Sequence, residues 1–114
     1  MKYALVIYNV LNADGTPPGR RPEIEAPIRA LLDHPHVIGW QRLMDTDSAT
    51  TVKTEGGRTL LVDGPFVDSK EYVGGVILVE TENLDGALAY AREVQEARGA
   101  GFGAIEVRPI LETG

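Results

Sequence analysis

The sequence predicts an α+β fold, a ferredoxin-like plait with an inserted β-hairpin. Two segments, 3–8 and 76–79, are nearly unbroken runs of apolar and β-prone residues, as in strands at the middle of a sheet. Two other segments, one near Ile24 and one after Asn83, repeat apolar residues at helical spacing. A Gly-Gly pair at 56–57 separates two further β-prone runs. The resulting order, βαβ, hairpin, βαβ, places two helices on one face of a mostly antiparallel sheet.

The first strand is followed by a loop and an amphipathic helix. Residues 9–21 hold a dense cluster of turn residues without periodicity, which predicts a long loop. The helix after it ends before Pro35. Its apolar face consists of Ile24, Ile28, Leu31 and Leu32. Because Pro27 lacks an N–H and is tolerated without distortion only in the first turn, the helix either starts near Ile24 or is kinked, and we expect the start near Ile24.

The middle of the chain predicts an edge strand and a hairpin. Residues 37–44 alternate weakly, as expected of an edge or interface strand with unequal faces. Residues 50–54 and 58–62 form the hairpin arms, since Gly-Gly allows positive φ at both central positions. The first arm is too polar to lie in a core, and the Asp63-Gly64-Pro65 sequence ends the second.

The last third predicts a buried strand, a helix and a closing strand. Residues 72–80 contain the apolar run that follows Gly74-Gly75. Asn83 is a candidate N-cap, and Gly99 with Gly101 supplies the helix stop. The apolar face of this helix consists of Leu84, Ala87, Leu88, Ala91 and Val94. Residues 104–110 return as an alternating strand.

Composition and charge restrict the possible classes of function. The 114 residues suffice for one domain, spanning 1–114, and 17 acidic against 11 basic residues give a net charge of −6. This balance argues against nucleic acid and anionic membranes, which select basic patches. There is no cysteine, so thiolate chemistry and disulfides are excluded. The apolar stretch at the N-terminus is too short for a signal peptide or a membrane span, so we expect a cytoplasmic protein.

The predicted sheet also indicates an oligomer. If both helices cover one face, the outward side chains of at least four strands remain on the other. That apolar area is too large for a small monomer to expose to water. We therefore expect a homodimer that packs sheet against sheet.

The segment around Asp63 carries a family resemblance. Asp63-Gly64-Pro65-Phe66, followed by Asp68-Ser69-Lys70-Glu71 and Gly74-Gly75, resembles the DGPF-type branch of the YCII-related family. The first strand, the helix after Asn83 and the closing Glu106-Val107-Arg108-Pro109-Ile110 are similar as well. The resemblance implies a dimeric α/β-barrel fold and an undetermined molecular function. Some genes of the branch neighbour sigma-factor genes.

Certain YCII-related proteins carry a His–Asp pair, with the histidine on the first helix and the aspartate before the central strand. Asp68 matches the place of the aspartate, whereas Ile24 stands at the place of the histidine. The resemblance therefore does not supply the acid–base pair of those relatives here.

Asp63 and Asp68 are the candidate catalytic residues. They lie five positions apart across a Gly-Pro turn, and two carboxylates in one pocket raise the pKa of one of them, which would make a general base. The structural alternatives are that Asp63 holds the turn through backbone N–H groups and that Asp68 is a solvated loop residue. Phe66, Lys70 and Arg42 are candidate ligand-binding residues. Trp40 and Tyr72 are more typical of a core.

No cofactor or metal is expected. The glycines lie in pairs or turns, and the Gly-rich segment 99–103 precedes a strand where a dinucleotide site needs a helix. His34-Pro35-His36 has only Asp33 as a nearby third ligand, which is a weak metal signal.

The sequence is compatible with three functions. The first is a YCII-related homodimer of undetermined role with a small-molecule pocket near Asp63, Phe66, Asp68 and Lys70. The second is a cofactor-free acid–base lyase or isomerase that uses Asp68. The third is an accessory regulatory protein associated with transcription control, which contacts a partner through the hairpin or the acidic surface.

Overall fold

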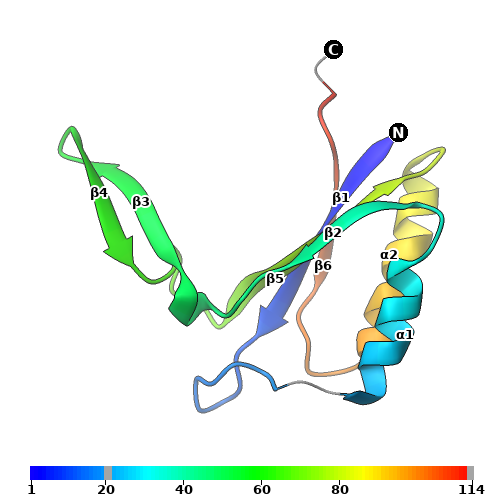
Figure 1. The fold of residues 1–114 in the computed structure, drawn as a ribbon, viewed down its shortest axis with the longest axis horizontal. Coiled ribbons are helices and arrows are strands. Elements are labelled where there is room, and N and C mark those ends of the chain that lie inside the picture. The colour runs from blue at the N-terminus through cyan, green and yellow to red at the C-terminus, as the bar shows by residue number, and fades with distance from the viewer. Residues whose placement is uncertain (20–21, 113–114) are drawn as a thin grey trace.

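The protein is an α+β domain in which two helices lie beside one sheet and a hairpin projects from the far end (Figure 1). The computed structural model describes residues 1–19 and 22–112. Within them the elements are β1 (Lys2–Val10), α1 (Pro22–Leu32), β2 (Val37–Arg42), a 3-10 turn (Thr46–Ser48), β3 (Thr50–Glu55), β4 (Arg58–Asp63), β5 (Glu71–Glu80), α2 (Leu84–Arg98) and β6 (Ile105–Pro109). The loop predicted at 9–21 includes two positions, 20 and 21, that lie outside the described residues.

The main sheet has four strands in the order β2-β5-β1-β6, and all neighbours are antiparallel. This is the strand order of a ferredoxin-like plait, with the hairpin β3–β4 inserted between β2 and β5. The two most apolar strands, β1 and β5, occupy the centre, and β2 is an edge strand, as the sequence predicts. The fold class is confirmed.

The core lies between the sheet and the helices. On the sheet side it contains Tyr3 and Leu5 of β1, which pair with Val79 and Ile77 of β5, and all four side chains are buried. Helix α2 supplies the other side of this core through Ala87, Tyr90, Ala91 and Val94. Apolar residues of α1 pack against the same cluster, so both helices cover one face of the sheet.

The opposite face of the sheet is not covered by this chain. Ala4, Val6, Val76 and Leu78 point away from the helices and are only partly buried. Glu106 and Arg108 of β6 flank them and approach each other to 3.9 Å. The result is an apolar sheet face with a charged border.

Helix α1 begins at Pro22, so the expected start near Ile24 is wrong. Pro22 occupies the first helical position, where the N–H has no partner within the helix and a φ near −65° is already helical. Pro27 then lies in the second turn and removes the bond that would reach the carbonyl of Glu23. Glu23 is exposed, so water can bond to that carbonyl and the helix continues.

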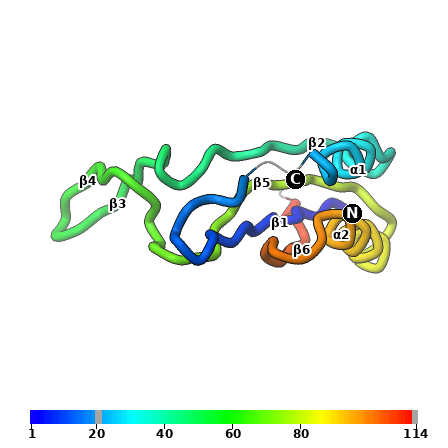
Figure 2. The backbone as a smooth tube through the Cα atoms, turned by 90° about the horizontal axis from the view of Figure 1, so that it is seen from below, coloured from blue at the N-terminus to red at the C-terminus, as the bar shows by residue number. Residues whose placement is uncertain are grey.

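The hairpin forms as predicted and stands apart from the main sheet. Gly56 and Gly57 have φ of 58° and 75°, and Glu55 pairs with Arg58 across them. Both positive angles are those of the two-residue turn that matches strand twist. Figure 2 shows β3 and β4 at the end of the molecule opposite the helices, where Val52 and Leu61 are exposed.

Local signals also set the ends of α2. The Asn83 side chain accepts a hydrogen bond from the Gly86 N–H at 3.2 Å, which confirms the N-cap. Gly99, with φ of 76°, ends the helix. Neither helix in the described part of the chain has the length and hydropathy that a bilayer crossing requires.

Candidate functional site

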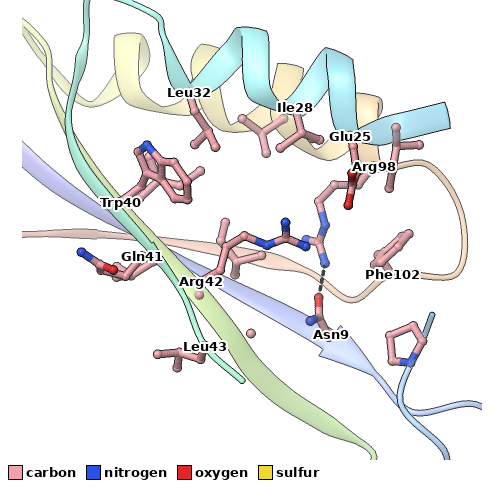
Figure 3. Close-up of a pocket in the computed structure, with 18 of the residues that line it drawn as sticks. Asn9, Glu25, Ile28, Leu32, Trp40, Gln41, Arg42, Leu43, Arg98 and Phe102 are labelled. Carbon is pink, nitrogen blue, oxygen red and sulfur yellow. Dashed lines mark hydrogen bonds between the residues drawn. The ribbon is translucent and has the colours of Figure 1, made fainter. Parts of the chain in front are cut away.

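A cavity of about 300 Å³ lies between α1 and the helix-facing side of the sheet (Figure 3). One part of its lining is apolar, with Ile28 and Leu32 from α1 and Trp40 from β2. The other part is polar and includes Arg42 of β2, Tyr72 of β5 and Arg98 of α2. Asn9 of β1 lines it as well, so five of the described elements meet at one partly enclosed site, which is typical of small-molecule sites.

Arg42 reaches the cavity from β2 at a point where its partner on β5 is a glycine. Arg42 pairs with Gly75, and a Cβ atom at Gly75 would stand 2.7 Å from the backbone oxygen of Gln41. A side chain at this position would push β2 away from the sheet. Gly75 thus permits β2 and β5 to pack closely beside Arg42.

Arg98 is held at the opposite wall and is only 5% exposed. Its guanidinium donates to the backbone oxygen of Tyr8, to Asn9 Oδ1 at 3.1 Å and to Gln95 Oε1 at 3.1 Å. The ring of Phe102 lies 5.2 Å from its central carbon, within the range of a cation–π contact. Burial lowers the pKa of Arg98, yet a guanidinium still carries its charge at neutral pH.

The side chain of Asn9 depends on a second glycine. A Cβ atom at Gly74 would collide with Asn9 Nδ2. Since Asn9 Oδ1 accepts a hydrogen bond from Arg98, the absence of a side chain at Gly74 helps to set the position of the guanidinium. The Gly74-Gly75 pair therefore leaves room beside both arginines, at Gly74 for the Asn9 side chain that binds Arg98 and at Gly75 for the strand that carries Arg42.

Tyr72 contributes a buried phenol to the cavity. The residue is 8% exposed, and its hydroxyl has no hydrogen-bond partner among the described residues. Burial raises the pKa of Tyr72 above its ordinary value; the nearby Asn9 side chain opposes this rise, and the charge on Asp45 adds to it. The phenol is thus protonated at neutral pH and available as a donor.

A second, more open groove of about 510 Å³ begins on the other side of Tyr72. Its lining includes Pro65, Val67 and Ser69, which belong to or follow the Asp-Gly-Pro-Phe segment. Because Tyr72 lines both spaces, this segment lies next to the cavity without lining it.

A model of the YCII-related domain matches residues 1–113. The chain belongs to the YCII-related family. It is also 39% identical over 69 residues to an uncharacterized protein of Rhizobium meliloti (strain 1021). That match covers 60% of this chain and 55% of the relative, so the chain spans about half the length of the relative.

In this YCII-related chain, the residues predicted around the motif lie at the surface. Asp63, Phe66, Asp68 and Lys70 are all exposed, and Phe66 reaches 77% exposure. None of the four is among the residues lining the cavity or the groove in the described chain. Arg42 is the predicted ligand-binding residue that the structure places in the cavity.

The turn at Asp63 is held mainly by its neighbours. The Gly64 N–H donates to the Ala49 oxygen at 2.8 Å, and Thr51 Oγ1 donates to the Gly64 oxygen at 2.7 Å. Gly64 has φ of 98°, in the region that favours glycine. These bonds give Gly64 a structural role at the base of the hairpin.

Ile24 and Asp68, the positions that match the His–Asp pair of the relatives, lie in different surroundings. Ile24 lines the cavity, whereas Asp68 is exposed and lies outside it.

At the other end of α1, the His36 N–H donates to Nδ1 of His34 at 3.1 Å, so this pair makes a local turn. Within residues 1–19 and 22–112, no group of three or more His, Asp or Glu side chains converges as a metal site would.

Sequence reasoning missed Asn9 and Arg98 and assigned Tyr72 to the core. Two signals point to these residues. Arg98 stands four positions after Val94 on the apolar face of α2, and a charged residue on a buried face needs partners. Gly74-Gly75 inside a strand marks a close approach of another chain segment.

Proposed function

We propose that this YCII-related protein, a member of the DGPF-type branch, is a small-molecule-binding homodimer. The observation that carries the proposal is the cavity beneath α1, whose lining combines apolar side chains with Arg42 and with Tyr72, a buried phenol without a hydrogen-bond partner among the described residues. Polar groups of this kind in an apolar recess fix the orientation of a ligand. Arg42 is common to the predicted and the observed site.

The DGPF segment belongs to the proposed site through the groove beside it. Pro65, Val67 and Ser69 line that groove, and Tyr72 separates it from the cavity. In this proposal Phe66, Lys70, Asp63 and Asp68 form the outer border of the binding region. The exposed position of Asp68, outside both spaces, favours binding over acid–base catalysis by that residue.

The apolar sheet face supports the homodimer. Ala4, Val6, Val76 and Leu78 form a contiguous apolar surface on one chain, and a second copy placed against it would remove this surface from water. Light scattering tests this part, with an expected mass of twice 12.3 kDa. The Val6→Lys variant should be monomeric, while Ala89→Lys on the exposed side of α2 should remain dimeric. A monomeric wild-type protein at micromolar concentration contradicts the dimer.

Ligand binding is testable through the single tryptophan of the chain, because Trp40 lines the cavity. A set of neutral and charged aromatic compounds of the size of benzene derivatives would be titrated while Trp40 fluorescence is recorded. We expect a saturable change with at least one compound. The same titration of Ile28→Trp, read by calorimetry, should show no binding because the indole fills the cavity. If no compound changes Trp40 fluorescence saturably, the small-molecule function is refuted.

A further inference from the structure

The charge lining the cavity differs in sign from that of the whole protein. Among the described lining residues, Arg29, Arg42 and Arg98 stand with Glu25 and Asp45, which leaves one net positive charge. The complete chain carries a net charge of −6. A local excess of positive charge in an acidic protein selects an anion at this place.

Two guanidinium groups converge inside the cavity. Figure 3 shows the guanidinium of Arg42 directed toward that of Arg98. Arg98 is fixed in advance by Tyr8, Asn9 and Gln95, and these bonds use three of its five N–H groups. The side chain of Arg42 makes no hydrogen bond or ion pair with the other described residues. Two like charges brought together in this way are complementary to an anion that contacts both, and a planar guanidinium binds a carboxylate with two parallel hydrogen bonds.

The unpartnered phenol is a second, independent indication of a ligand. Tyr72 lines the cavity, and its buried hydroxyl has no hydrogen-bond partner in the described part of the chain. A buried polar group without a partner is costly, and a ligand oxygen would satisfy it. A neutral phenol suits an anionic oxygen because it donates a hydrogen bond without adding charge.

The remaining walls define the rest of the ligand. Leu32 and Trp40 lie on the side of the cavity away from Arg98 and Phe102, and Ile28 lies between the two sides (Figure 3). Their apolar surfaces favour an apolar group, and the indole offers a face for an aromatic ring. The one net positive charge of the described lining residues suits a monoanion better than a dianion.

We propose that the cavity binds a small monocarboxylate with an apolar body, whose carboxylate contacts Arg42, Arg98 and Tyr72 and whose body contacts Ile28, Leu32 and Trp40. This inference rests on the small-molecule function proposed above and names the chemical class of its ligand. The two arginines and the phenol come from three different elements, so the site exists only in the folded chain.

The test compares benzoate with benzamide and phenyl phosphate, using Trp40 fluorescence and calorimetry. Benzamide has the shape of benzoate without the charge, and phenyl phosphate carries more charge. We expect benzoate to bind at least about tenfold more tightly than benzamide, because a hydrogen bond to a charged group contributes about ten- to hundredfold in affinity. We also expect benzoate to bind more tightly than phenyl phosphate.

Single substitutions test which side chains bind the carboxylate of benzoate. Arg42→Gln should weaken benzoate binding about tenfold or more and leave benzamide binding nearly unchanged. Tyr72→Phe removes only the hydroxyl and should weaken benzoate binding severalfold. Arg92→Gln, on the exposed side of α2, is the matched control and should bind benzoate as the wild type does.

The outcomes separate the two proposals. Equal binding of benzoate and benzamide, or tighter binding of phenyl phosphate, overturns the carboxylate assignment and leaves the small-molecule function in place. Unchanged benzoate binding in Arg42→Gln also overturns the assignment. Failure of all three compounds and of the wider compound set overturns both.

Discussion

Replacing Gly75 with alanine tests whether the close approach of β2 to β5 positions the site. The new Cβ atom would lie 2.7 Å from the backbone oxygen of Gln41 and 3.5 Å from Cα of Arg42. Both contacts are with backbone, which moves only if the strand moves. Overpacking of this kind lowers the free energy of unfolding by about 1–3 kcal/mol. The unfolded chain has less conformational freedom with alanine than with glycine, which raises the free energy of unfolding by about 0.4–1 kcal/mol. We expect the free energy of unfolding to fall by about 1–2 kcal/mol.

Gly39→Ala is the matched control, because Gly39 lies in the same strand pair. A Cβ atom there would stand 3.9 Å from Cδ1 of Leu78, an ordinary van der Waals contact. We expect its free energy of unfolding to stay within about 1 kcal/mol of the wild-type value.

Urea denaturation at one protein concentration measures both variants, in samples whose oligomeric state is the same by light scattering. Trp40 fluorescence with benzoate then reports whether displacement of β2 carries Arg42 away from the cavity. A Gly75→Ala protein as stable as the Gly39→Ala protein, with unchanged benzoate affinity, would refute the role of Gly75.

Three further predictions concern single contacts. The hydroxyl of Tyr90 donates to the Leu31 oxygen at 2.8 Å, so Tyr90→Phe should cost about 1 kcal/mol at neutral pH by urea denaturation. Burial, with a smaller effect of Glu93, raises the pKa of Tyr90 to about 12, so its neutral form stabilises the fold fully below pH 10. This stability, at most about 3 kcal/mol, is lost as pH rises from 10 to 12. Over that range the free energy of unfolding should therefore fall less in Tyr90→Phe than in the wild type. Asn83→Ala removes the cap on the Gly86 N–H and should lower the unfolding free energy by about 1 kcal/mol; an unchanged urea midpoint would argue against the cap. Gly57→Ala forces a β-carbon onto a φ of 75° and should destabilise the hairpin by about 1 kcal/mol, visible as faster amide exchange in β3 and β4.

Features that depend on neighbouring residues could be predicted from the sequence. The hairpin follows from the Gly56-Gly57 turn, and the start of α2 follows from Asn83, because both structures are set by hydrogen bonds and backbone angles within a few residues. The start of α1 was missed because two prolines compete for the first turn and only one occupies it.

The candidate site was harder to predict because its contacts are not local. Asn9 and Arg98 are 89 positions apart in the chain, yet their side chains are hydrogen-bonded. The sequence motif drew attention to Asp63 and Phe66, which are exposed, while the cavity uses Arg42, Tyr72 and Arg98. Motif reasoning finds residues that are close in sequence, whereas a cavity collects residues from several elements.

The sequence by itself determined the α+β class, the central position of the two apolar strands, the hairpin and the family. Apolar periodicity and turn chemistry are properties of short segments, so they can be read before the chain folds. Only the tertiary structure decided that two arginines and a buried phenol share one cavity. That arrangement depends on how closely β2 and β5 pack at Gly75 and on where α2 ends against β1, and both are properties of packing between distant segments.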